Sequence, residues 1–106
     1  MKEGKEMTNK LFNEQTRKHI EKLEQFTPIV ERVHGQHHPE FFEVHQLFNQ
    51  LNKKIKEADN HEVDLADEFK ELRKVTTHYK VPNDVCESYE AVYNMLEDLD
   101  QAYFAK

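Results

Sequence analysis

Residues 30–44 read VERVHGQHHPEFFEV and place one glycine, three histidines and one proline between two apolar helical patterns. Gly35 suits the left-handed residue that commonly follows the end of a helix. Pro39 suits the first turn of a new helix, where its missing N–H has no helical partner to lose. The stretch therefore predicts a corner between two helices, with histidines that either bind a metal or only form a polar surface.

The segment before the corner, residues 8–34, has the pattern of a long amphipathic helix. Its apolar side chains mostly stand three or four positions apart, at Leu11, Phe12, Ile20, Leu23, Phe26, Val30 and Val33. Pro28 removes a backbone donor within this pattern. We therefore expect either a kink at Pro28 or two helices separated near Thr27.

Three further helices are predicted after the corner. From Pro39 the apolar residues step by three and four along a narrow seam, Phe41, Val44, Phe48, Leu51 and Ile55. Asp64 as N-cap, with Asp67 in the first turn, opens a short helix that ends around Thr77. Pro82 restarts a helix with a second seam, Val85, Tyr89, Val92, Leu96, Leu99 and Tyr103. Four such helices with short connections predict an all-α, antiparallel up-and-down four-helix bundle.

Length and composition limit the class of protein. The 106 residues suit a single domain over 1–106, in which we expect residues 1–7 to be disordered and Met7 to be an alternative start. The net charge of −6, with no face that gathers Lys and Arg, argues against nucleic acid as a partner. No apolar run approaches the roughly 20 residues that span a bilayer, and the first residues lack the apolar core of a signal peptide. We expect no membrane partner and a cytoplasmic location.

Cys86 is the single cysteine of the chain and cannot form an internal disulfide. Its position in a helical pattern predicts a small buried residue rather than a nucleophile, since nothing local marks a base beside it.

Four histidines lie close to the corner, at His34, His37, His38 and His45. Neutral imidazole is a good ligand for iron, zinc or copper, and facing helices can aim several such side chains at one point. Gly35 and Pro39 interrupt the helix, however, and no HExxH, CxxC or Glu-x-x-His pattern is present. The residues alone leave two readings open, a metal site or exposed corner histidines with His45 hydrogen-bonded at the edge of the seam. Solvated roles are expected for the other three, His19, His61 and His78.

Two stretches carry a resemblance to a known family, VERVHGQHHPEF at residues 30–41 and LRKVTTHYKVPNDVCESYEAVYNMLEDLDQ at residues 72–101. The second has a Thr-rich turn, Val-Pro, an acidic residue, Cys, then an aromatic and a Tyr-Asn pair. Together they resemble the hemerythrin-like domain of the iron–sulfur cluster repair proteins, the di-iron proteins of RIC or ScdA type. The resemblance implies a four-helix bundle that holds two irons with histidines and bridging carboxylates. It also implies a role in repairing iron–sulfur clusters after oxidative or nitrosative stress.

Only part of that iron site transfers to this sequence. The histidine of the VERVH element corresponds to His34. The family's helix-1 histidine falls near Asn13, and its His-x-x-x-Glu element falls near Ala58 and Glu62, where only the carboxylate remains. The terminal His-x-x-x-Glu would begin at Lys106. The resemblance thus describes a bundle that keeps its scaffold while most of its ligands are lost, shortened or relocated.

Two functions follow as expectations. The first is an iron-binding or accessory protein of iron–sulfur cluster repair, with iron as cofactor, held as a di-iron site if the resemblance extends that far, and with the metal ligands His34, His38, His45 and Glu62. The second is a metal-free helical interaction module, which pairs as a homodimer or with a full-length family member through its apolar seams. A true enzyme is the least expected of the alternatives.

Overall fold

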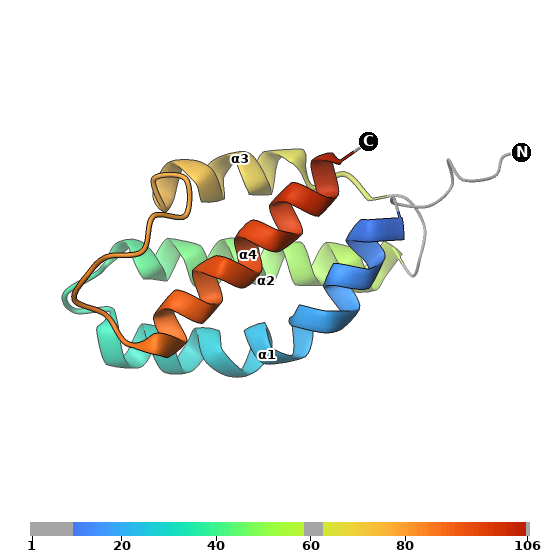
Figure 1. The fold of residues 1–106 in the computed structure, drawn as a ribbon. Helices are drawn as coiled ribbons and strands as arrows, with labels where there is room; N and C mark the ends of the chain where they lie inside the picture. Colours follow the sequence, from blue (N-terminus) through green and yellow to red (C-terminus); the bar gives the residue numbers. More distant parts are fainter. Residues whose placement is uncertain (1–9, 59–62, 106) are drawn as a thin grey trace, which may run out of the picture.

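A computed structural model describes residues 10–58 and 63–105, and within these ranges the chain is all-helical and has no β-strand. The four helices are α1 (Lys10–His34), α2 (Glu40–Ala58), α3 (Ala66–Val75) and α4 (Glu87–Phe104). Figure 1 shows successive helices running in opposite directions, with α4 crossing the others obliquely. The all-α prediction is confirmed. The expectation for residues 1–7 lies outside the described residues.

The two seams predicted from the sequence lie in the core, together with apolar residues of α1 and α3, among them Leu23 and Phe69. Phe48 on α2 is 1% exposed and Leu96 on α4 is 0% exposed. Phe41, Val44 and Leu51 are also buried, while Ile55 packs partly buried against the core. None of the described helices is both long enough and apolar enough to cross a membrane.

Helix α1 continues through Pro28 without a break, so the alternative of two helices separated near Thr27 is wrong. Proline lacks the N–H that would reach the carbonyl of Glu24, one turn earlier. The preceding residue adds a local hydrogen bond, since the Thr27 hydroxyl donates to the Leu23 carbonyl oxygen at 2.9 Å. Pro28 itself is exposed, and that face of the helix is open to solvent.

Gly35 does not have the left-handed conformation predicted for it, because its φ is not positive. Instead, the absence of a side chain at Gly35 allows the end of α1 and the start of α2 to approach closely. A methyl group at this position would lie 2.5 Å from the Glu31 carbonyl oxygen and 2.8 Å from the ring of Phe42. Glycine therefore lets α2 turn back closely against the last turn of α1.

The left-handed residues lie in the α3–α4 connection, residues 76–86, where no glycine is present. Thr77, His78 and Tyr79 have φ values of 54°, 59° and 63°. Such a conformation costs about 1–2 kcal/mol for each L-residue. The Thr76 hydroxyl stabilises the turn by donating to the Leu72 carbonyl and accepting from the Tyr79 N–H.

Two predicted helix starts need correction. Pro82 does not restart a helix, because α4 begins only at Glu87 and residues 80–86 are turn and extended chain. The N-cap of α3 is Leu65, one residue later than Asp64. The Asp64 side chain still accepts a hydrogen bond from the Ala66 N–H at 3.2 Å, so it organises the turn that leads into the helix.

Candidate metal and thiol site at the histidine corner

His34 and Cys86 meet at one end of the molecule, although they stand 52 residues apart in the sequence. The Nε2 atom of His34 lies 3.2 Å from the Sγ atom of Cys86. His34 is the last residue of α1, and Cys86 is the N-cap of α4, with extended backbone at φ −83° and ψ 173°. The end of one helix and the start of another thus position an imidazole and a thiol against each other.

Cys86 is exposed, so the prediction of a small buried residue is wrong. The helical spacing predicted the burial of Cys86 wrongly, because Cys86 precedes the first residue of α4 and does not belong to the apolar face of that helix. The base that the local sequence lacked comes from a distant part of the chain. Thiol and imidazole are donors that bind iron and zinc, and an imidazole nitrogen can also accept a thiol proton.

The ring of Tyr89 supports this end of the bundle between two histidines. Its centroid lies 5.6 Å from that of His34 and 5.6 Å from that of His38. The hydroxyl of Tyr89 is 3.0 Å from that of Tyr93. Burial, followed by the hydrogen bond between the two hydroxyls, raises the pKa of Tyr89 far above its usual value. This phenol therefore stays neutral and acts as a packing and hydrogen-bonding group.

His38 uses both ring nitrogens to bridge two carboxylates. Its Nδ1 lies 3.0 Å from Oε2 of Glu40 at the start of α2, and its Nε2 lies 2.9 Å from Oδ1 of Asp84 in the α3–α4 connection. Burial is the largest single influence on the pKa of His38 and lowers it, but the hydrogen bonds to Glu40 and Asp84 together outweigh it and the pKa is raised. We call these three residues the His38 clasp.

Both ring nitrogens of His38 are hydrogen-bonded, so a metal ion could bind to His38 only if the clasp opened. A protonated imidazole donates from both nitrogens and has no lone pair to offer a metal ion. His45 is also engaged, since its Nδ1 lies 3.1 Å from Oε2 of Glu31 on α1. This contact agrees with the hydrogen-bonded role considered for His45. Glu62 lies outside the described residues.

The three predicted ligands that lie within the described residues have different partners. His34 and His38 share one end of the bundle, but each faces a different partner, and His45 faces Glu31. Across residues 10–58 and 63–105, no group of three or more His, Cys, Asp or Glu side chains is arranged to hold a metal ion. Of the predicted ligands, His34 has the thiol of Cys86 at contact distance, and imidazole and thiolate are both donors for iron or zinc.

Sequence reasoning also missed a second histidine contact along the bundle. His19 is buried rather than solvated, and its Nε2 lies 3.2 Å from Oδ2 of Asp98. The contact joins α1 to α4. The spacing of residues along a single helix cannot predict such a pair, because the contact depends on how α4 crosses α1.

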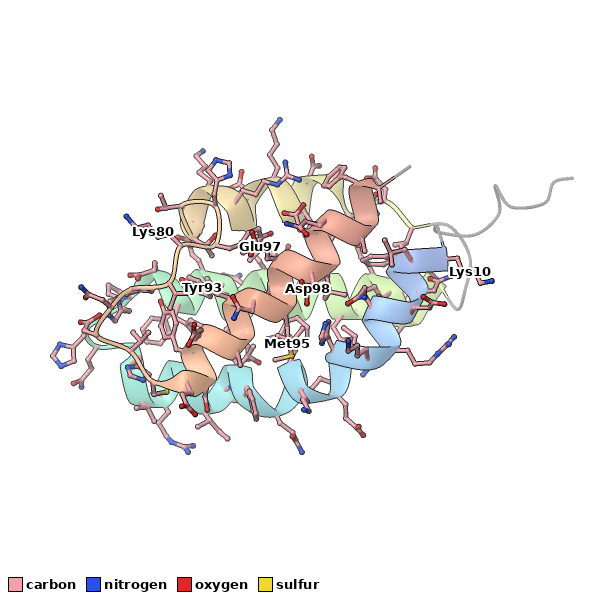
Figure 2. All side chains as sticks on the ribbon, viewed as in Figure 1. Lys10, Lys80, Tyr93, Met95, Glu97 and Asp98 are labelled. Atoms are coloured by element: carbon pink, nitrogen blue, oxygen red, sulfur yellow. The ribbon has the colours of Figure 1, made fainter. Side chains whose placement is uncertain are left out.

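A cleft of about 680 Å³ adjoins the clasp under the α3–α4 connection. Glu40 lines it from α2 and Tyr93 from α4, and the remaining wall comes from residues 75–77 and 80–83. Figure 2 shows Tyr93 pointing from α4 into the arc of the connection. The connection that carries Asp84 and Cys86 therefore stands partly free of the core.

Comparisons with protein-family models, with curated proteins and with solved structures find no match to this chain.

Proposed function

We propose that the chain is an iron-binding accessory protein of iron–sulfur cluster repair in the cytoplasm, with a hemerythrin-like up-and-down bundle. In place of a di-iron centre, it binds one ion through His34 and Cys86. The observation that carries this proposal is the 3.2 Å separation of His34 Nε2 and Cys86 Sγ. Each of the two stretches that resemble the repair family supplies one member of this pair.

The chemistry of the pair suits temporary iron binding. Iron is held through imidazole nitrogen and thiolate sulfur, and the thiol releases its proton when it binds. Cys86 is exposed, and His34 is only partly buried. A site with two protein donors at the surface leaves the remaining coordination positions to water or to groups of an acceptor protein, which favours release of the ion over permanent storage.

Metal analysis tests the proposal. Protein purified without a histidine tag and equilibrated with excess Fe²⁺ under anaerobic conditions should bind close to one iron per chain. His34→Ala and Cys86→Ser should each remove the metal, because each variant deletes one of two donors. His37→Ala is the matched control, since His37 is an exposed histidine of the same corner and should leave the metal content unchanged. Metal at background in the wild type would contradict the proposal.

A metal-free interaction module is the second candidate, and exposed apolar side chains near the corner favour it. Val33 is 59% exposed and Ile29, one turn earlier on α1, is 45% exposed. Phe42 at the start of α2 is 52% exposed. The partner is a second copy of the chain or a full-length family member. The partner would contact this surface, because the seams first considered for pairing are buried within the chain's own core.

Sedimentation of the purified protein distinguishes the second candidate. A self-associating module should sediment as a dimer, and Val33→Asp should convert it to a monomer without unfolding it. A wild-type monomer that also fails to bind the full-length family member would exclude this function.

A further inference from the structure

We propose that His38 is a positioning residue that holds Cys86 in contact with His34 through the His38 clasp. This inference deepens the proposed function, because it concerns the same His34–Cys86 pair. It assigns to a neighbouring histidine the task of keeping the exposed α3–α4 connection in place. The hydrogen bond between His38 and Asp84 then controls how well the thiol and the imidazole of the pair are held together.

The path of the chain explains how His38 can position Cys86. Asp84 is bonded to His38 at 2.9 Å and lies only two residues before Cys86. A displacement of Asp84 therefore moves the thiol, since a single residue separates the two. The next element after Cys86 is the rigid helix α4, whose first residue is Glu87. Cys86 is thus fixed on one side by α4 and on the other side by the clasp.

Carboxylate oxygens face both ring nitrogens of His38. Glu40 from α2 and Asp84 from the connection are carboxylates that only accept hydrogen bonds. Tyr89 from α4 contributes an aromatic ring, with His34 of α1 on that ring as well. Lys80 lines the neighbouring cleft together with Glu40.

Both ring nitrogens of His38 are engaged, with Oε2 of Glu40 at 3.0 Å and Oδ1 of Asp84 at 2.9 Å. Glu40 belongs to α2 and ties the ring to the bundle, whereas Asp84 belongs to the connection. Water can replace the bond to Asp84 more easily, because the Asp84 side chain is 64% exposed and that of Glu40 is 35% exposed. Loss of either His38 or Asp84 should therefore free the segment that leads into Cys86.

The single cysteine allows a test that needs no metal. The rate at which Cys86 attacks an aromatic disulfide, with release of a coloured thiolate, reports this thiol alone. In the wild type, His34→Ala should slow the reaction several-fold, because the nearby imidazole no longer accepts the thiol proton. In His38→Gln and in Asp84→Ala, the further change His34→Ala should have no effect on the rate. His37→Gln should retain the wild-type dependence on His34.

The pH profile separates positioning from general support of the fold. The ratio of the rates with and without His34 should fall as the pH rises in the wild type and in His37→Gln, because hydroxide then removes the thiol proton increasingly well without the imidazole. The ratio should stay flat in Asp84→Ala, which changes an exposed side chain and leaves the core intact. An undiminished dependence on His34 in Asp84→Ala would overturn the inference.

The measurements distinguish failure of the proposed function from failure of the positioning role. If the wild type carries no iron while the clasp variants still abolish the dependence on His34, the positioning role stands and the metal proposal falls. If the wild type carries iron and Asp84→Ala neither reduces its iron affinity nor changes the thiol kinetics, the positioning role falls and the metal proposal stands.

Discussion

Tyr79→Phe is expected to destabilise the protein more than the loss of an ordinary hydroxyl. The Tyr79 hydroxyl donates to Oδ2 of Asp100 at 2.6 Å, and this carboxylate is 2% exposed. Arg73 donates to both oxygens of the same carboxylate. The substitution keeps the aromatic ring and the ion pair and removes one hydrogen bond to a buried charge.

The magnitude follows from the character of that bond. A hydrogen bond to a charged group contributes about 1.5–3 kcal/mol, compared with about 0.5–1.5 kcal/mol for a neutral one. The ring remains in place, so no cavity adds to the loss. Tyr79 also ends the strained left-handed turn, and the bond to Asp100 helps to hold that turn. We expect a loss of about 2 kcal/mol, which lowers the Tm of a chain of this size by about 8–16 °C.

Urea unfolding followed by far-ultraviolet circular dichroism measures this loss. In an Asp100→Asn background, Tyr79→Phe should cost less, about 0.5–1.5 kcal/mol, because the acceptor no longer carries a charge. A loss below about 0.5 kcal/mol in the wild-type background, with unchanged cooperativity, would refute the account of the buried carboxylate as the anchor of the connection.

Three further outcomes test other parts of the structure. Gly35→Ala should lower the free energy of unfolding by about 1–3 kcal/mol, because the methyl group would overlap the Glu31 carbonyl oxygen, and urea titration would measure it. His78→Gly should raise the melting temperature slightly, since relief of the left-handed strain, about 1–2 kcal/mol, exceeds the entropy cost of glycine, about 0.5–1 kcal/mol. The stability difference between the wild type and His38→Gln should be complete below about pH 6.5, the unfolded pKa. It should shrink as the pH rises through the raised pKa of folded His38, and urea titrations over a pH series would show a constant difference if the clasp does not exist.

The fold was largely predictable because apolar spacing reports which side of a helix is buried. Phe48 and Leu96 occupy the core as their spacing requires. The ends of the helices were less predictable, because they depend on contacts with distant residues. Gly35 allows a close approach rather than a left-handed turn, and the left-handed turn lies at Thr77–Tyr79 without a glycine.

Only one member of the candidate site, His34, was predictable from the sequence. The resemblance to the repair family pointed to His34, and the structure brings a thiol to that imidazole. No pattern in the sequence pairs Cys86 with a residue 52 positions earlier. That contact depends on the path of the α3–α4 connection, which the clasp and the Tyr79 anchor determine through side-chain contacts between helices.

A titration with Co²⁺ tests most directly whether His34 and Cys86 bind a metal ion together. Cobalt bound to a thiolate shows a near-ultraviolet charge-transfer absorption, and Cys86 is the only cysteine that can produce it. The wild type should develop this absorption at one equivalent, Cys86→Ser should lack it, and His34→Ala should require a much higher concentration of Co²⁺. No absorption in the wild type, or an identical titration in His34→Ala, would contradict the account.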